Sequence, residues 1–261
     1  MSAISPWQRR LRQTVGLPEA REAWPEALQT LPVDLEAASL TVPFSLPLLA
    51  WARQRRRQSG QRLVIGLNGP VGAGKSTLAR QLLRLAPRLD LNLAVVSIDD
   101  LYRPLEERRR VLAGNPFGVS RVPPGSHDVG LLLEAIDSWR ASGELVVPRF
   151  NKTLAGGEGE RDGWSTCEAD VVLLEGWLIG CRALADGQLA AAMARAAERK
   201  AGTTGWADGD APAGLALSPE ELRWLPRWNG ALRDYHPLWD QLDSLWLCLL
   251  YTSPSPRDAT L

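Results

Sequence analysis

Short apolar runs alternate with helix-periodic segments along most of the chain. Apolar runs bounded by glycine or by other turn residues are typical of buried strands in parallel sheets. Five such runs are RLVIGLNG, LNLAVVSIDD, ELVVPRF, ADVVLLEGWLIG and SLWLCLL. Helices are predicted in KSTLARQLLRLAP, in PPGSHDVGLLLEAIDSWR, which Ser126 or Asp128 can cap, and in SPEELRWLPRWNGALRDYHPLWDQLD. Strands that alternate with helices predict an α/β fold, a three-layer αβα sandwich with a mostly parallel sheet.

The pattern divides the chain into three parts. Residues 1–60 contain prolines that break a helical pattern into short pieces, and they predict a helical extension that packs on the core. Residues 61–247 hold the alternation of strands and helices and form the main domain. Within that domain, an Ala/Gly-rich stretch at about 201–216 predicts a mobile insertion. Residues 248–261 follow neither pattern.

Charge and cysteine usage exclude several classes of protein. The chain has 30 basic and 30 acidic residues, so it lacks the basic excess of a nucleic-acid-binding protein. Its three cysteines show no CxxC pairing and no metal-ligand spacing, which indicates a reduced, cytoplasmic protein. The N-terminus has no apolar signal core, and no apolar run reaches the length of a membrane span, about 18 residues. We therefore expect no nucleic-acid partner and no membrane partner, and a monomer is slightly favoured.

Lysine is rare in this chain and therefore informative. Only three of the 30 basic residues are lysine, at positions 75, 152 and 200, and the others are arginine. A chain with this bias uses arginine wherever any cation is sufficient. Lysine is then expected where a compact ammonium group is required.

A phosphate-binding motif follows the first predicted strand. Residues 69–76 match G-x-x-x-x-G-K-[ST] between a strand and a helix, which is the context of a P-loop of the NTPase type. Backbone N–H groups and the helix dipole would hold the phosphates of a nucleotide. Lys75 would pair with the β- and γ-phosphates, the Ser76 hydroxyl would bind Mg²⁺, and Thr77 would contact the α-phosphate. The predicted nucleotide-binding residues are Gly69, Pro70, Val71, Gly72, Ala73, Gly74, Lys75, Ser76 and Thr77.

Two carboxylates are predicted beside the phosphates, because ligands bind at the carboxyl ends of parallel strands. Asp99 ends the second predicted strand and is the candidate base for an acceptor hydroxyl. The alternative is that Asp99 and its neighbour only end a strand and cap a helix. Glu175 ends another buried strand, where an acid is costly unless it holds Mg²⁺, a water or a cation.

Basic side chains further along the chain suggest a site for the acceptor. Arg121 and His127 could bind a carboxylate or a hydroxyl, although RVPPGSHD also fits a turn with a helix cap. Lys152 and Arg161 flank a glycine-rich stretch and could stabilise charge that develops on the transferred phosphoryl group. The same stretch also fits a solvated hairpin tip.

Taken in order, these segments resemble one family. They resemble the motifs of the D-glycerate 3-kinases of plant and cyanobacterial type. In chain order these motifs are GxxGxGKST, SIDD-[FL]-Y, RG-x-PG-[ST]-HD, P-x-F-[DN]-K with G-x-G-[DE]-R, and EGW. These enzymes are related to uridine kinase, phosphoribulokinase and pantothenate kinase. The resemblance covers residues from about Leu46 to Leu247, and includes a late helix with Asn229, Tyr235 and Trp239.

The resemblance implies that the chain phosphorylates D-glycerate to 3-phosphoglycerate with ATP and Mg²⁺. By the D-x-[FL]-Y pattern, Asp99 rather than Asp100 is implied as the base. The motifs also imply a substrate set of Asp100, Tyr102, Arg121, His127, Asp128, Lys152 and Arg161.

The chain departs from the family pattern at several positions. Val122 replaces a usual glycine, Asn151 a usual aspartate, and Glu160 stands where aspartate is usual. The family would also continue after the last predicted strand through a W-R-x-x-Q-E helix, whereas this chain ends in YTSPSPRDATL. We therefore expect residues 248–261 to be a non-native tail that replaces the true C-terminus, and we expect the chain to be less stable and less active without that helix.

Two other functions remain open from the sequence. A related P-loop kinase could act on another small alcohol, such as a nucleoside or a pantothenate-like acceptor. An ATPase with no small acceptor would be a different class of protein, and a GTPase should show an N-K-x-D motif, which the chain lacks. The set Arg121, His127, Lys152 and Arg161 favours an acidic acceptor, whereas a nucleoside would need an aromatic or amide pocket that the sequence does not reveal, and an ATPase should hydrolyse ATP with no acceptor added.

Overall fold

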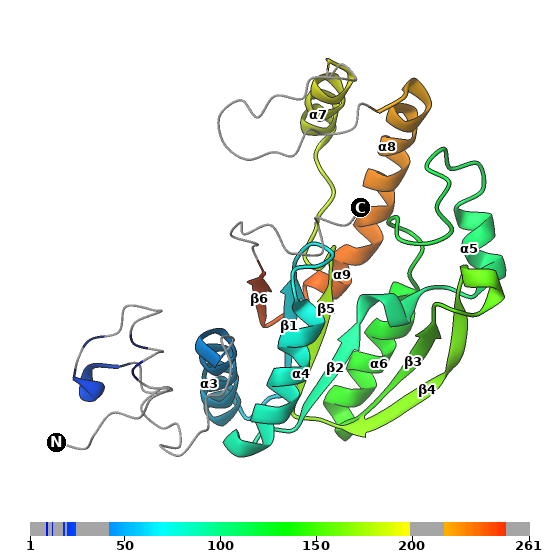
Figure 1. Ribbon diagram of the computed structural model, residues 1–261. Coiled ribbons are helices and arrows are strands. Elements are labelled where there is room, and N and C mark those ends of the chain that lie inside the picture. Colours follow the sequence, from blue (N-terminus) through cyan, green and yellow to red (C-terminus); the bar gives the residue numbers. More distant parts are fainter. Residues whose placement is uncertain are drawn as a thin grey trace, which may run out of the picture.

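A four-stranded sheet forms the centre of the protein in a computed structural model, which describes residues 9, 12, 18, 20–24, 42–198 and 217–248 (Figure 1). The strands are β1 (Leu63–Asn68), β2 (Leu93–Ser97), β5 (Val171–Gly176) and β6 (Ser244–Leu247), in the order β2-β5-β1-β6. Every neighbouring pair in this sheet is parallel. The predicted α/β fold with a mostly parallel sheet is therefore confirmed.

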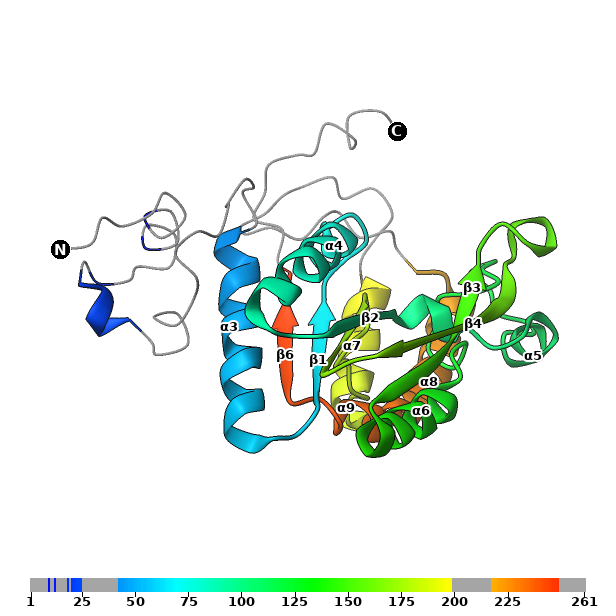
Figure 2. The ribbon, with the colours of Figure 1, turned by 90° about the horizontal axis from the view of Figure 1, so that it is seen from below.

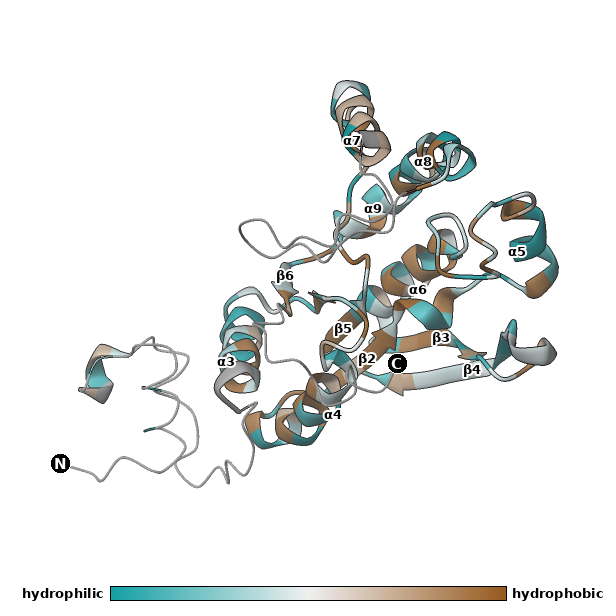
Figure 3. Cartoon of the chain, turned by 45° about the horizontal axis from the view of Figure 1, so that its top comes forward, coloured by the Kyte–Doolittle hydropathy of each residue, from teal (hydrophilic) through white to brown (hydrophobic). Residues whose placement is uncertain are grey.

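The alternation of side chains explains why the strands are apolar throughout. Successive residues of a strand point to opposite faces, so a strand covered on both faces needs apolar residues at every position. In β1, Leu63 and Ile65 pack into one buried cluster, whereas Val64 packs into another on the opposite face. In β5, Leu173 and Leu174 divide in the same way. The inner strands are accordingly among the most hydrophobic parts of the chain (Figure 3).

Two groups of helices cover the two faces of the sheet (Figure 2). The helices α3 (Val42–Ser59) and α4 (Lys75–Leu85) supply the first cluster with residues such as Leu49 and Leu82. The helices α6 (Val129–Ser142) and α9 (His236–Trp239) supply the second, in which Trp139 is fully buried. Of the two predicted caps for α6, Asp128 is the one the structure uses, because its carboxylate accepts from the N–H of Leu131.

The run ELVVPRF is not part of the parallel sheet, and that expectation was wrong. It forms β3 (Glu144–Asn151), which pairs antiparallel with β4 (Glu160–Glu168) in a separate two-stranded sheet. In β3, Leu145 and Val147 are buried while Val146 is exposed, which is the alternation of a half-buried strand. The strand β4 was not predicted, because its sequence ERDGWSTCE is polar and its residues are mostly exposed.

The remaining described helices lie around the upper end of the sheet. They are α5 (Leu105–Val111), α7 (Asp186–Glu198) and α8 (Pro219–Ala231), with α7 and α8 packed side by side (Figure 1). The last predicted helix is thus divided into α8, a 3-10 turn at Leu232–Tyr235, and α9. Further 3-10 turns lie at Arg21–Ala23, Ala86–Leu89, Ile98–Leu101 and Ala155–Gly157.

Several predictions about organisation concern residues beyond those described. The mobile insertion at 201–216 lies outside the described residues, as do most of residues 1–41 and the tail after Cys248. Within the predicted extension 1–60, α3 is described and packs on the core. Across the described part of the chain, the structure contains no helix with the length and apolar character needed to cross a membrane.

A close contact between β5 and the turn after β2 generates the first testable prediction. A Cβ atom at Gly176 would clash with the side chain of Ile98, which begins the turn that carries Asp99. We expect Gly176→Ala to lower the free energy of unfolding by about 1–3 kcal/mol, because the packed core cannot admit the extra carbon without shifting. Urea unfolding of both proteins measures this difference.

The matched control for this substitution is Gly187→Ala. A Cβ at Gly187, in α7, would meet nothing within 4 Å. Alanine is favoured over glycine in helices by up to about 1 kcal/mol, so this variant should be neutral or slightly stabilised. Equal losses in the two variants would contradict the close packing of β5 against Ile98.

Candidate active site

The predicted phosphate-binding loop connects β1 to α4. The strand ends at Asn68, and the helix begins at Lys75. Gly72 and Gly74 have φ values of 83° and 79°, a left-handed conformation that favours glycine. The first N–H groups of a helix have no acceptor within the helix and, together with its dipole, favour an anion. The local geometry is therefore that of a phosphate-binding loop.

Lys75 is held inside this loop. Its side chain is buried, and Nζ donates to the carbonyl oxygens of Gly69 at 2.7 Å and of Pro70 at 2.8 Å. An ammonium group held in this way is already directed to the centre of the loop. A phosphate anion could compete with the two neutral carbonyls for it, since hydrogen bonds between charged groups are the stronger ones.

Asp99 forms an ion pair with the second motif lysine. Asp99 lies on the 3-10 turn that follows β2, and Lys152 follows the end of β3. The Lys152 Nζ and the Asp99 Oδ2 are 2.6 Å apart. Burial, followed by the charge of Asp99, raises the pKa of the nearby Tyr102 hydroxyl. A cation from the β3–β4 hairpin and a phenol from the end of the same turn therefore lie close to this carboxylate.

Glu175 lies between the loop and Asp99. It is the register partner of Leu67 in β1 and of Ser97 in β2, and only 9% of its surface is exposed. Burial raises the pKa of Glu175, while the neighbouring Ser97 hydroxyl and the charge of Lys75 act in the opposite direction. The Ser97 hydroxyl accepts from the backbone N–H of Asp99, at 3.4 Å. Ser97 thus lies beside Glu175 in the sheet and contacts the turn that carries Asp99.

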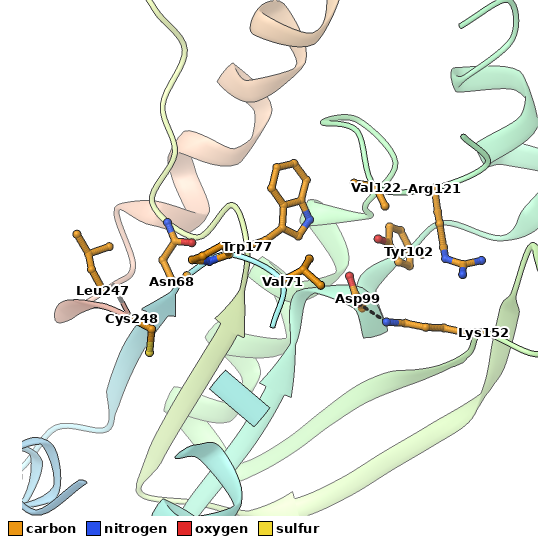
Figure 4. Close-up of a pocket in the computed structure, with 12 residues that line it drawn as sticks. Asn68, Val71, Asp99, Tyr102, Arg121, Val122, Lys152, Trp177, Leu247 and Cys248 are labelled. Atoms are coloured by element: carbon orange, nitrogen blue, oxygen red, sulfur yellow. Dashed lines mark hydrogen bonds and ion pairs between the residues drawn. The ribbon is translucent and has the colours of Figure 1, made fainter. Parts of the chain in front are cut away.

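Asp99, Tyr102 and Lys152 line a cavity of about 710 Å³, whereas Lys75 and Glu175 are not part of its lining (Figure 4). Its lining includes the loop residues Gly69, Pro70 and Val71. Figure 4 shows Val71 in the middle of the view, with Arg121 and Lys152 on one side and Leu247 and Cys248 on the other. The rest of its lining is Asn68, Arg121, Val122, Trp177, Leu247 and Cys248. The phosphate-binding loop, the candidate base and two cations therefore share one space.

Comparison with known proteins relates this geometry to one group of enzymes. A protein of Arabidopsis thaliana named chloroplastic D-glycerate 3-kinase is 31% identical over 178 residues, which are 58% of this chain and 39% of that protein. An uncharacterized kinase of Schizosaccharomyces pombe, mug58, is 26% identical over 209 residues, covering 76% of this chain and 68% of the other. No protein-family model matches the chain.

The likeness extends to a solved structure. D-glycerate 3-kinase from Cryptococcus neoformans superposes with a TM-score of 0.66 at 25% identity, covering 81% of this chain and 73% of that one. The chain is homologous to D-glycerate 3-kinase. Its relatives are named kinases, so the predicted resemblance and the fold of a P-loop kinase are confirmed. The chain spans less than half of the Arabidopsis protein.

Several residues of the predicted substrate set do not line the cavity. The Asp100 carboxylate accepts from the N–H of Phe150 at 3.0 Å and pairs with Arg149 at 3.3 Å, which fixes β3 beside the turn. Asp128 caps α6 and pairs with Arg161 at 2.9 Å. Arg161 also donates to the carbonyl oxygen of Tyr102, at 3.1 Å. The structure therefore places Asp100, Asp128 and Arg161 behind the cavity wall.

His127 also lies behind the wall. It is 1% exposed, its ring stacks on Tyr102 with centroids 4.5 Å apart, and its Nδ1 is 2.7 Å from the Tyr235 hydroxyl. Burial lowers the pKa of His127 to about 3, so the ring is neutral near pH 7. It supports Tyr102 from behind, whereas Arg121 reaches the cavity and donates to the carbonyl oxygen of Gly157.

Arg108 joins the backbone segments that surround Arg121 and the β3–β4 turn, and the sequence analysis did not identify it. Its fully buried guanidinium donates to the carbonyl oxygens of Arg103, Ser120, Glu158 and Gly159, at 2.6–3.3 Å. It also lies over the Phe150 ring, 4.9 Å from the centroid. The only sequence signal was an arginine run, LEERRRV, in which this position cannot be distinguished from its neighbours.

We expect Arg108→Met to lower the free energy of unfolding by about 2–4 kcal/mol, because four carbonyl groups, one buried and three partly buried, would lose their donor. Arg110→Met is the matched control on the same helix. Arg110 is exposed and donates only within the helix, to the carbonyl of Glu106, so its loss should be within about 0.5 kcal/mol. Similar urea-unfolding curves for the two variants would contradict the bridging role of Arg108.

The buried His127 predicts a loss of stability in acid. Its folded pKa of about 3 lies below the usual value of about 6.5, so between these pH values the unfolded chain binds a proton that the folded chain excludes. The free energy of unfolding should therefore fall as the pH falls, by about 2 kcal/mol from this group between pH 7 and pH 5.

The variant His127→Asn tests this pH dependence. Asparagine can still hydrogen-bond to the Tyr235 hydroxyl but does not titrate in this range. Its free energy of unfolding should fall less between pH 7 and pH 5 than that of the natural protein. Parallel pH profiles for the two proteins would show that His127 is not the source of the acid sensitivity.

Proposed function

We propose that the chain phosphorylates a small hydroxy acid with ATP, converting D-glycerate to 3-phosphoglycerate. The observation that carries the proposal is the Asp99–Lys152 ion pair, which lies in the same cavity as the phosphate-binding loop and Arg121. A kinase must bring an acceptor hydroxyl, a base and the terminal phosphate together, and this cavity holds groups suited to each. Because the chain spans only part of its relatives, the activity is an inference from these residues.

In this proposal the loop holds the triphosphate. The backbone of residues 69–74 and the first turn of α4 would surround the phosphate oxygens, with Thr77 at the α-phosphate. Lys75 would exchange its two carbonyl partners for the β- and γ-phosphates. The ammonium is already in place, so little reorganisation is needed.

The residues present also fit a magnesium ion. Mg²⁺ in kinases is bound by one or two carboxylates together with substrate phosphates and waters, rather than by a cage of protein ligands. Glu175 is a nearly buried carboxylate, and burial raises its pKa by disfavouring the charged form. A bound cation would stabilise that charged form. The Ser76 hydroxyl would be the second protein ligand. The ion would neutralise charge on the β- and γ-phosphates.

The acceptor is proposed to bind between Arg121 and Asp99. The Arg121 guanidinium would hold the carboxylate of the hydroxy acid. The oxygen of the acceptor hydroxyl would form a bond to the terminal phosphorus of ATP while the bond from that phosphorus to ADP breaks. Asp99 would take the proton that this hydroxyl loses. Lys152 would stabilise the charge on the transferred phosphoryl group. Tyr102 borders the same space, while Asp100, His127, Asp128 and Arg161 hold its wall in position.

A nucleoside acceptor is the second candidate. Tyr102 and Trp177 line the cavity and offer the aromatic surface that a nucleoside would need, and the sequence alone did not reveal such a surface. Arg121, which lines the same cavity, favours the acid instead. A panel of acceptors decides between the two.

A cytoplasmic location is also part of the proposal. The three cysteines, Cys167, Cys181 and Cys248, are free, as expected in a reducing compartment.

The test of this function is ADP release from Mg-ATP against a panel of acceptors, with D-glycerate, a nucleoside and no acceptor as separate arms. Release that depends on D-glycerate would support the proposal. Release with the nucleoside would favour the second candidate, and equal release without an acceptor would indicate an ATPase.

The assignment of the base predicts a specific loss of activity. Asp99→Asn should lower kcat by a factor of about 10² or more while ATP still binds, because the amide cannot accept the proton. Asp100→Asn is the comparison, since an amide oxygen can still accept from the Phe150 N–H and turnover should be largely kept. If Asp100→Asn lost turnover and Asp99→Asn did not, the roles of the two residues would be reversed.

A further inference from the structure

Val122 has a backbone conformation that is costly for valine. Its φ is 98°, and among the described residues only Asp90, at 54°, and Ala155, at 51°, are other non-glycine residues with positive φ. Asp90 and Ala155 have φ values of the left-handed helical region, whereas Val122 lies beyond it and is β-branched, which makes it a genuine outlier. Conformations of this kind cost about 1–3 kcal/mol and persist only where the surroundings enforce them.

The surrounding loop is fixed on both sides of Val122. The preceding residue, Arg121, donates to the carbonyl oxygen of Gly157 in the β3–β4 hairpin. On the other side, the Ser126 hydroxyl donates to the carbonyl of Pro123 at 2.6 Å, and the N–H of Gly125 donates to the Tyr235 hydroxyl at 3.1 Å. Glycine at position 122 would adopt the same conformation without strain. The strain is therefore a cost of keeping a side chain at this position.

The side chain of Val122 lies at the acceptor end of the cavity. It lines that space together with Arg121, Tyr102 and Trp177, on the side of the Asp99–Lys152 pair (Figure 4). Its exposed fraction is 43%, so it is not a core residue and much of the isopropyl group is open to solvent or to a ligand. An acceptor held between Arg121 and Asp99 would meet this isopropyl group, which a glycine at the same position would replace with open space.

We propose that Val122 is a specificity-determining residue, whose isopropyl group narrows the acceptor end of the cavity and selects the smallest hydroxy acids. The inference rests on the proposed function, because it concerns the acceptor of the same site. A difference of one carbon unit in such a pocket changes kcat/KM by about 10–200-fold. Strain that is kept at a site for recognition is a recurrent feature of functional residues.

The experiment compares kcat/KM for D-glycerate with kcat/KM for D-erythronate, which keeps the carboxylate and a terminal hydroxyl and adds one CHOH unit. Val122→Gly and Val122→Ala should each lower the preference for D-glycerate by about 10-fold or more, because both remove bulk. Val122→Thr keeps the branched shape and should keep the preference. The KM for ATP should be unchanged in all three variants.

A stability measurement separates strain from size. Val122→Gly should raise the melting temperature by about 2–5 °C, because glycine relieves the backbone strain, and Val122→Ala should raise it less. Asp90→Gly is the distant control: it also removes a residue with positive φ, but Asp90 lies outside the cavity lining. It should leave the preference between the two acids unchanged.

The outcomes distinguish this inference from the proposed function. If the natural protein phosphorylates D-glycerate and Val122→Gly and Val122→Ala keep its preference, the role of Val122 is overturned and the proposed function stands. If the natural protein phosphorylates no hydroxy acid, both are overturned. A preference that falls equally in Asp90→Gly would show a general loosening and would also overturn the inference.

Discussion

The parallel register of β5 between β1 and β2 is the constraint on which the site depends. It sets Glu175 level with Leu67 and with Ser97, so the chain leaves all three strands at the same edge of the sheet. At that edge β1 continues into the phosphate-binding loop, and β2 continues into the turn that carries Asp99. Strand pairing therefore brings one loop and two carboxylates together, and the apolar residues on both faces keep these strands buried between the two layers of helices.

The acceptor half of the site is assembled differently, from segments outside the sheet. The β3–β4 hairpin brings Lys152 to Asp99, and Asp100 holds the hairpin through the N–H of Phe150. The buried Arg108 joins the hairpin turn to the loop before Arg121 through four backbone carbonyls. Hydrogen bonds to backbone groups thus position the cations. Ring contacts of Tyr102 with His127 and Phe150 add to these polar bridges.

The two halves differ in how far the sequence predicted them. The phosphate-binding loop and the end of β2 are local patterns, so Lys75 and Asp99 could be placed from a few neighbouring residues. The acceptor half depends on contacts between residues far apart in the chain. Arg108 could not be distinguished from the other arginines of its run. His127 was expected to contact the acceptor, whereas it is buried and packs on the Tyr102 ring. The polar strand β4 was missed because strand prediction relies on apolar residues.

A double-mutant cycle on Asp99 and Lys152 tests the central claim most directly, namely that this ion pair acts as one unit in phosphoryl transfer to the acceptor, with Asp99 at the hydroxyl and Lys152 at the phosphoryl group. The measured quantity is kcat/KM for the acceptor in Asp99→Asn, in Lys152→Met and in the double variant. Residues that act as a unit give non-additive losses, so the loss in the double variant should fall short of the product of the single losses by about 10-fold or more. Losses that multiply would show that the two residues act independently, and would contradict the account.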